Sequence, residues 1–253
     1  MIVCKSPAEI EKMRAANQLV ARILDDLAAL VQPGVSTADL DAEAEARVRA
    51  GGAEPAFKGY RGYPATLCAS VNEQVVHGIP NTRPLASGDI ISLDMGVKLN
   101  GYYGDSAVTV AVGTVSDEVK KLLRVTEEAL ERGIAQVRIG GRISDIGHAI
   151  QAHVEANGFS VVREFVGHGI GASLHEEPQI ANYGDANRGP RMAEGMTFAI
   201  EPMVNMGRPS VRVLADGWTA VTRDGSLSAH FEHTVAVTKA GPDILTLRPV
   251  AAR

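Results

Sequence analysis

A repeat within the sequence constrains the fold more than any other feature. Helix-forming segments and glycine breaks recur after a shift of 106 residues, which carries Val31 onto Val137. The other aligned pairs are Gly34 and Gly140, Asp39 and Asp145, Leu40 and Ile146, Ala46 and Ala152, Val48 and Val154, Ala50 and Ala156, and Gly52 and Gly158. Chance likeness between amphipathic helices explains part of this pattern, but breaks at matched offsets favour an internal duplication.

Each half of the repeat predicts two helices followed by strands. The first helix is capped by Ser6 with Pro7 at its first position and ends at Pro33-Gly34. The other predicted helices cover Thr37 to about Ala50, Ser116 to the break at Gly140-Gly141, and about Ser144 to Asn157. Residues 53–88 and 203–228 are rich in glycine and proline and predict short strands and turns.

Together these elements predict an α/β (α+β) domain over residues 1–253. It would consist of two similar halves, about 1–112 and 113–253, that share one curved sheet with helices on its outer face. The seam between two such halves is a natural cleft.

Composition and charge exclude several classes of protein. With a net charge of -5, the chain has no general attraction for nucleic acid or anionic membranes. No apolar run approaches the roughly 18 residues of a membrane span, and the N-terminal residues lack a secretion signal. Cys4 and Cys68 are too few for a disulfide framework and fit a reducing cytoplasm.

Two aspartates lie on the arms of a predicted hairpin over residues 90–110. Asn100-Gly101 is a strong signal for a tight two-residue turn, because both residues tolerate positive φ. Counting outward from that turn, Gly96 faces Asp105, so side-chain alternation puts Asp94 on the same face as Asp105. Two carboxylates there repel unless a cation lies between them. The alternative is that they cap a bulge or face water.

Three further segments carry single polar residues inside strand-like apolar runs. These residues are His168 between two glycines, Glu201 after Phe198-Ala-Ile, and Glu232 before His233-Thr-Val. A glutamate buried in such a strand is costly unless it is paired or coordinated, although each residue taken alone could lie at a solvent-exposed strand end. Two Asp, one His and two Glu suit a pair of divalent ions with shared carboxylates.

The motifs around these residues resemble those of a known family. The chain is similar to type I methionine aminopeptidases of peptidase family M24, and its N-terminus resembles that of the bacterial form. The similar segments are Leu93-Asp-Met-Gly, Gly104-Asp-Ser-Ala, Gly167-His-Gly-Ile-Gly171, Ile200-Glu-Pro-Met, Phe231-Glu-His-Thr, Gly59-Tyr-Arg-Gly-Tyr-Pro64, Val76-His-Gly-Ile-Pro80, His175-Glu-Glu-Pro178 and Asp216-Gly-Trp218. The resemblance implies the duplicated pita-bread (creatinase/aminopeptidase) fold with a curved, mostly antiparallel sheet.

The resemblance also implies roles for the five polar residues. Asp94 would hold one divalent ion, Asp105 and Glu232 would bridge both ions, and His168 and Glu201 would complete the other site. Glu201 would also carry a proton from the attacking water toward the leaving amine. The ions implied are two of Co²⁺, Mn²⁺, Fe²⁺ or Zn²⁺, and carboxylate-rich sites accept each of these.

Substrate contacts follow from the same resemblance. His175 would donate a hydrogen bond to the scissile carbonyl and His77 would contact the scissile amide, although both could be solvated loop histidines. The pocket for a methionine side chain would consist of Tyr60, Tyr63, Cys68, Leu174 and Trp218, with Phe57 on its rim, and core packing is the alternative for each. His148 and His153 match no motif and are expected to be structural, and His233 is expected to point away from Glu232.

The implied activity is removal of the N-terminal methionine from nascent proteins and peptides with a small second residue. The partners would be nascent N-termini, with the ribosome as a candidate meeting place, for a cytoplasmic monomer without nucleic-acid recognition or membrane attachment. Because Ile2 is bulky, the protein is expected to keep its own Met1. Two residues depart from the family pattern, His230 where glutamine is common and Leu174 where phenylalanine is common. The rivals are a proline-directed peptidase of the same fold and a catalytically dead relative that binds partners.

Overall fold

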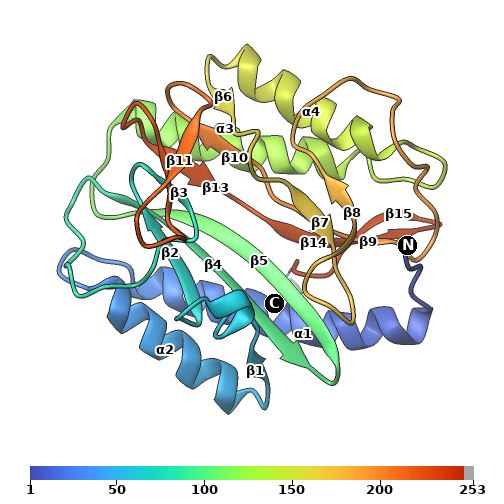
Figure 1. The fold of residues 1–253 in the computed structure, drawn as a ribbon, viewed down its shortest axis with the longest axis horizontal. Helices are drawn as coiled ribbons and strands as arrows, with labels where there is room; N and C mark the ends of the chain where they lie inside the picture. Colours follow the sequence, from blue (N-terminus) through green and yellow to red (C-terminus); the bar gives the residue numbers. More distant parts are fainter. Residues whose placement is uncertain (248–253) are drawn as a thin grey trace, which may run out of the picture.

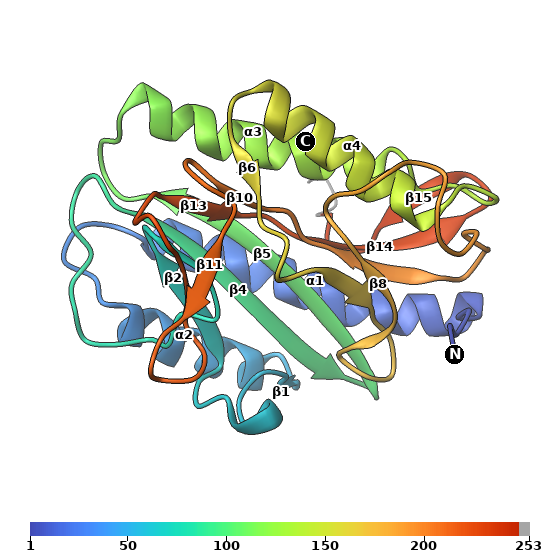
Figure 2. The same ribbon diagram turned by 45° about the horizontal axis from the view of Figure 1, so that its top comes forward.

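Two pairs of helices enclose a set of antiparallel strands in the computed structural model, which describes residues 1–247 (Figure 1). Helices α1 (Pro7–Leu30) and α2 (Thr37–Ala50) lie along one side of the strands. Helices α3 (Asp117–Ile134) and α4 (Ile143–Ala156) lie together along the other side. The view in Figure 2 separates the two pairs, with the strands running between them. The predicted chain order of helices and strands is confirmed.

Capping residues fix the starts of α1 and α2 where the sequence predicts them, whereas α3 ends at Ile134, short of the predicted break at Gly140-Gly141. The Ser6 amide donates to Glu9 Oε2 at 2.7 Å, and the Ser6 hydroxyl accepts from the Glu9 amide, which completes a capping box at the start of α1. Ser36 and Asp39 do the same for α2. Helices α2 and α4 each have 14 residues, and their first residues are Thr37 and Ile143, which the shift of 106 residues aligns. Helix α1 ends slightly earlier than its apolar pattern suggests, since Val31 is its C-cap.

The strands form four hydrogen-bonded groups in which every pairing is antiparallel. One group contains β1 (Glu54–Pro55), β2 (Leu67–Val71), β4 (Ile90–Leu99) and β5 (Tyr102–Ala111). A second contains β7 (Gly167–Gly169), β8 (Glu176–Ile180), β9 (Thr197–Ile200), β14 (His233–Thr238) and β15 (Gly241–Ile244). Two smaller groups contain β6 (Ser160–Val161), β10 (Met203–Asn205) and β13 (Ser228–His230), and β3 (Gln74–Val76), β11 (Val211–Val213) and β12 (Ala220–Thr222). A short 3-10 helix, η1, covers Tyr60–Gly62.

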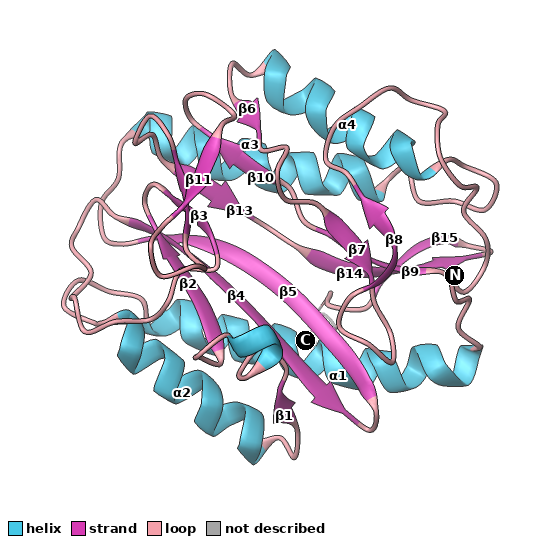
Figure 3. Cartoon of the chain, in the orientation of Figure 1, coloured by secondary structure: helices cyan, strands magenta, loops and turns pink. Residues whose placement is uncertain are grey.

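Among residues 1–247 one isolated β-bridge joins the first of these groups to the second half of the chain. Ala107 on β5 pairs with Glu232, which lies between β13 and β14. Within residues 1–247 the strands thus form four hydrogen-bonded groups in place of the predicted single curved sheet. In Figure 3 the long strand β5 lies between β4 and strands of the second half.

Each half has its own apolar core. Helix α1 packs on β4 and β5, and α3 packs on α4 and on strands of the second half, so helices cover the outer side of the strands as predicted. Gly104 allows the close approach of α1 to β5, since a Cβ there would lie 2.8 Å from backbone atoms of Ala16 and Asn17. Within residues 1–247 no helix is both long and apolar enough to cross a bilayer. The predicted domain limit at residue 253 lies outside the described residues.

Candidate metal centre

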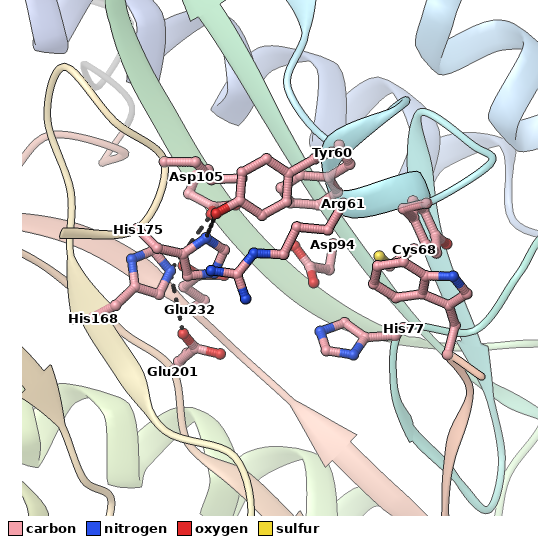
Figure 4. Close-up of a pocket in the computed structure, with 14 residues that line it drawn as sticks. Tyr60, Arg61, Cys68, His77, Asp94, Asp105, His168, His175, Glu201 and Glu232 are labelled. Atoms are coloured by element: carbon pink, nitrogen blue, oxygen red, sulfur yellow. Dashed lines mark hydrogen bonds and ion pairs between the residues drawn. The ribbon is translucent and has the colours of Figure 1, made fainter. Parts of the chain in front are cut away.

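The five polar residues singled out in the sequence line one cavity between the two halves. Asp94 comes from β4, Asp105 from β5, His168 from β7, Glu201 from the end of β9, and Glu232 from the link between β13 and β14. In Figure 4 their side chains point toward one another from these separate segments. The structure therefore brings the whole predicted set together, while the role of each residue as a ligand stays a prediction.

The hairpin has the register that its turn predicts. Asn100 and Gly101 both have positive φ, and Gly96 pairs with Asp105 while Asp94 pairs with Ala107. Asp94 and Asp105 are consequently diagonal neighbours on one face of the hairpin.

The bridge between the halves holds Asp105 beside Glu232. The Glu232 amide donates to the Ala107 carbonyl at 2.9 Å, and the Ser106 hydroxyl donates to the Glu232 carbonyl at 2.6 Å. The Thr234 hydroxyl donates to the Asp105 carbonyl at 2.8 Å. These bonds fix the backbone on both sides, so the two carboxylates cannot separate without breaking the junction.

His168 presents one ring nitrogen to the carboxylates. Its Nδ1 lies 2.9 Å from the Gly169 carbonyl, which can only accept, so Nδ1 carries the proton and Nε2 keeps a free lone pair. Nε2 lies 3.8 Å from Asp105 Oδ2 and 3.6 Å from Glu201 Oε1. Both separations are too long for hydrogen bonds but leave room for an ion that binds at about 2.0–2.2 Å from each ligand. One ligand atom each from Asp105, His168 and Glu232 lie within 4.8 Å of one another.

The carboxylates have no protein partners for their buried oxygens. Asp94 Oδ1, Asp105 Oδ1 and Glu232 Oε1 are buried without a hydrogen bond among the described residues. Burial raises the pKa of Asp94 to about 7 and that of Glu201 to about 8. Burial, reinforced by neighbouring carboxylates, also raises the pKa values of Asp105 and Glu232. Because unpaired buried charge is costly, this donor set fits bound divalent cations.

An apolar pocket adjoins the acidic cluster. Tyr63 and Trp218 meet edge to face with ring centroids 5.1 Å apart, and Cys68 pairs with Asp94 across β2 and β4. Leu174 and Phe57 line the same cavity. The Tyr63 hydroxyl lies 3.0 Å from the carbonyl oxygens of Leu67 and Gly78 and can donate its one proton to either, so its polar end is satisfied, and Tyr63 also lines the cavity. The predicted pocket residues thus share one cavity with the acidic cluster.

Both predicted substrate histidines reach this cavity. The His175 ring stacks on Tyr60 with centroids 5.3 Å apart, and its Nδ1 lies 2.9 Å from the Tyr60 hydroxyl. Burial, with a smaller effect from nearby Arg61, lowers the pKa of His175. Burial likewise lowers the pKa of His77 to about 4. Both rings are therefore neutral at pH 7. His77 also has φ +60, a conformation that non-glycine residues seldom adopt outside constrained sites.

The loop that carries His175 is fastened to the N-terminal segment. Lys5 Nζ donates to Glu176 Oε2 at 2.5 Å, and the Lys5 side chain is 3% exposed. The Ser173 amide donates to the other oxygen of Glu176 at 3.1 Å. The Lys5 amide donates to the Gly195 carbonyl at 2.7 Å, so the segment is anchored on both sides of the loop.

Sequence reasoning assigned no role to Asn17 or Arg61, and it noted His230 only as a departure from the family pattern. Asn17 sits on the apolar face of α1 and its Oδ1 accepts from the Asp105 amide at 3.2 Å. A polar residue in that otherwise apolar face was the available signal. His230 is fully buried, and its Nε2 lies 3.6 Å from Glu201 Oε2. Arg61 lines the cavity mouth.

The remaining histidines lie away from the cavity. His148 Nδ1 lies within hydrogen-bonding distance of the Gly184 carbonyl, and His153 Nε2 lies within hydrogen-bonding distance of the Glu128 carboxylate. The His233 Nδ1 bonds to the Thr246 hydroxyl, and His233 does not line the cavity.

Comparison with known proteins agrees with this fold and donor set. The family model described as metallopeptidase family M24 matches residues 11–239, and the chain belongs to that family of metal-dependent peptidases. Within it, the chain belongs with the methionine aminopeptidases. Methionine aminopeptidase 1 of Bacillus subtilis is 56% identical over 97% of this chain and 99% of its own length. The methionine aminopeptidase of Clostridium perfringens is 52% identical over 98% of this chain and 99% of its own length.

Solved structures confirm the pita-bread fold. Methionine aminopeptidase from Rickettsia prowazekii superposes with a TM-score of 0.96 at 44% identity, covering 98% of this chain and 100% of that one. Prolidase from Pyrococcus furiosus shares the fold with a TM-score of 0.79 at 21% identity, and this chain covers 66% of its length. That likeness reflects the fold alone.

Proposed function

We propose that the protein removes the N-terminal methionine from peptides and nascent proteins whose second residue is small. The observation that carries this proposal is a cluster of partnerless buried carboxylate oxygens beside an apolar pocket. The names of relatives that are 45–56% identical over nearly the whole chain support it. One end of the cavity suits hydrolysis of an amide, and the other suits an unbranched apolar side chain.

Two divalent ions are the proposed cofactors, drawn from Mn²⁺, Fe²⁺, Co²⁺ or Zn²⁺. Asp94 would hold one ion, Asp105 and Glu232 would bridge the pair, and His168 with Glu201 would hold the other. A carboxylate offers two oxygens for bridging, whereas a histidine offers one nitrogen. When bound, such ions lower the pKa of an attacking water and polarise the scissile carbonyl.

Glu201 is the proposed carrier of the proton during hydrolysis. Its side chain is buried at the edge of the acidic cluster, and the Asn182 side chain donates to its carbonyl at 3.0 Å. Burial raises the affinity of a carboxylate for a proton, so the ionised Glu201 side chain can take a proton from the attacking water. It then delivers that proton to the leaving amine.

Two neutral histidines would position the scissile bond. When the Tyr60 hydroxyl donates to Nδ1 of His175, Nε2 carries the proton and can donate to the carbonyl oxygen as it gains negative charge. His77 packs edge to face against Phe165 and Trp218, which holds its ring at the cavity wall, where we place the scissile amide. A neutral ring suits both tasks, since it adds no net charge beside the cations.

The apolar end of the cavity would receive the methionine side chain. Tyr60, Tyr63, Cys68, Leu174 and Trp218 line the cavity together with Phe57, which we place at the rim of the pocket. A thioether packs favourably against aromatic edges, and an unbranched chain enters a narrow pocket at low steric cost.

The proposal also covers the domain organisation, oligomeric state, location and substrates of the protein. We propose a single catalytic domain of two similar halves, about 1–112 and 113–253, that acts as a monomer in the cytoplasm. Its substrates would be the N-termini of nascent chains, at the ribosome or after release. The net charge of -5 offers no general attraction for nucleic acid, so nucleic-acid recognition has no part in the proposal.

Peptide cleavage after chelation tests the proposed function. The chelated protein should cleave Met-Ala-Ser only after a divalent ion is restored, and should leave Xaa-Pro peptides intact. Asp94→Ala should abolish turnover while the circular dichroism spectrum stays that of the wild type. Asp185→Ala, an exposed aspartate outside the cavity, is the matched control. Cleavage of Xaa-Pro in place of Met-Ala-Ser, or full activity of the Asp94 variant, would overturn the proposal.

A further inference from the structure

Arg61 is a cation at the mouth of an otherwise acidic cavity. Its side chain is exposed and lines the cavity, and its guanidinium lies 5.4 Å from the centre of the Tyr60 ring. Figure 4 shows it reaching from beside Tyr60 toward His175. Tyr60 in turn stacks on His175, so the positive charge of Arg61 lies near a histidine that we place at the scissile bond.

The backbone around Arg61 is built to hold this orientation. Arg61 has φ 51 and ψ 22, in the left-handed region, between Gly59 at φ 85 and Gly62 at φ 91. The turn closes on itself, because the Gly59 amide donates to Tyr63 at 2.8 Å and the Tyr63 amide donates to Tyr60 at 3.0 Å. A left-handed arginine costs about 1–2 kcal/mol, and such strain is typically retained at functional sites.

The guanidinium of Arg61 has no anionic partner within the described chain. Several arginines on the outer helices pair with carboxylates, as Arg14 does with Asp243 at 2.6 Å and Arg49 with Glu45 at 2.7 Å. Among residues 1–247 Arg61 makes no such pair, and its guanidinium lies over the face of the Tyr60 ring. Its five donors therefore remain available to a ligand in the cavity mouth.

We propose that Arg61 forms a subsite for a substrate carboxylate on the leaving-group side of the scissile bond. This inference rests on the proposed function, which places the methionine side chain in the enclosed pocket and the rest of the peptide at the mouth. Since the second residue is small, the first carboxylate able to reach the guanidinium is an aspartate or glutamate side chain at the third residue. The C-terminal carboxylate of a tripeptide offers the same chemistry.

Matched peptides measure this subsite directly. We compare kcat/KM for Met-Ala-Glu-Ser-amide and Met-Ala-Gln-Ser-amide, which differ by one charge at the third residue. The glutamate peptide should be favoured about two- to five-fold, the effect of a solvent-exposed ion pair. The preference should shrink at high ionic strength, because salt screens exposed charges. A second pair, Met-Ala-Ser as free acid and as amide, separates the terminal carboxylate from the side chain.

Variants of the arginine assign the preference. Arg61→Gln should bring the glutamate-to-glutamine ratio to about one, and Arg61→Lys should keep part of it, because a lysine keeps the charge without the planar fork. Arg132→Gln on the exposed face of α3 removes the same charge away from the cavity and should keep the wild-type ratio.

The outcomes separate this inference from the proposed function. A free-acid preference that depends on Arg61 supports the subsite, with the terminal carboxylate as its source. The subsite is overturned if wild-type kcat/KM is the same for both members of each peptide pair, or if the preference survives Arg61→Gln. In either case the peptides are still cleaved, so the proposed function stands. If neither Met-Ala peptide is cleaved by the metal-loaded protein, the proposed function itself fails.

Discussion

Replacing Lys5 with methionine removes one partner of a buried ion pair beside the site. The side chains of Lys5 and Glu176 are 3% and 14% exposed, and Nζ lies 2.5 Å from Oε2. Methionine keeps most of the apolar stem but leaves the carboxylate without its cation. Breaking such a pair costs about 3–5 kcal/mol. We expect the lower end, about 3 kcal/mol, because Glu176 keeps the hydrogen bond from the Ser173 amide.

A double-mutant cycle isolates the pair. Lys5→Met and Glu176→Gln should each destabilise the protein, while the double variant should lose clearly less free energy of unfolding than the sum of the two single losses. The expected coupling energy is about 2 kcal/mol, within the range for contacting residues. Urea unfolding of the metal-loaded proteins, followed by circular dichroism, gives the free energies. Lys239→Met is the matched control, because Lys239 and Glu194 are 82% and 54% exposed at 3.7 Å, and its loss should stay below about 0.5 kcal/mol.

Strict additivity of the two substitutions would refute this reasoning, since independent residues show no coupling. The pair also holds the loop that carries His175, so Lys5→Met should lower kcat/KM for a Met-Ala peptide as well as stability. Unchanged kinetics in a folded variant would mean that the loop keeps its position without the N-terminal anchor.

Three further predictions concern the metal centre and the chain end. In chelated protein, folding holds Asp94 and Glu201 protonated up to pH about 7 and about 8, whereas both ionise near pH 4 when unfolded. The free energy of unfolding should therefore fall as pH rises, until each folded pKa is passed. Between about pH 7 and 8 the fall is about 1 kcal/mol per pH unit and comes mainly from Glu201, because Asp94 becomes ionised across that range, and bound Mn²⁺ should abolish the fall. At lower pH the buried histidines act in the opposite sense, and a flat urea midpoint from pH 7 to 8 would argue against the assignment. His230→Ala should weaken Mn²⁺ binding roughly 10- to 100-fold in calorimetric titration, because the His230 ring adjoins the predicted ligand Glu201, and His230→Gln should retain most of the affinity. Equal Mn²⁺ affinity of the wild type and both variants would exclude a role of His230 in metal binding. Intact mass of the expressed protein should include Met1, since the second residue is bulky, and its absence would count against the proposed specificity.

Local chemistry made much of the fold predictable. Ser6 caps α1 as expected, and Asn100-Gly101 sets the register that places Gly96 opposite Asp105. Such signals act over a few residues, so they can be read in sequence order. The internal repeat could be recognised for the same reason, because glycine breaks at matched offsets are local signals that mark equivalent helix ends in the two halves.

Contacts between distant residues could not be predicted in this way. Nothing local in Ala107 signals its bridge to Glu232, and nothing in Lys5 signals its pairing with Glu176. The five ligand candidates were identified by the cost of burying charge in apolar strands and by family motifs. Arg61 belongs to a quoted motif, but its direction depends on a left-handed backbone that its sequence neighbours alone do not fix.

The junction at β5 ties the reaction chemistry to the order of synthesis. The predicted ligands extend from Asp94 to Glu232, and the last of them pairs with a strand made more than a hundred residues earlier. A chain interrupted at the end of β13 contains the hairpin but lacks Glu232. Prematurely terminated or proteolytically shortened products should therefore be inert toward peptides, which keeps unfinished copies of a hydrolase harmless while they await completion or degradation.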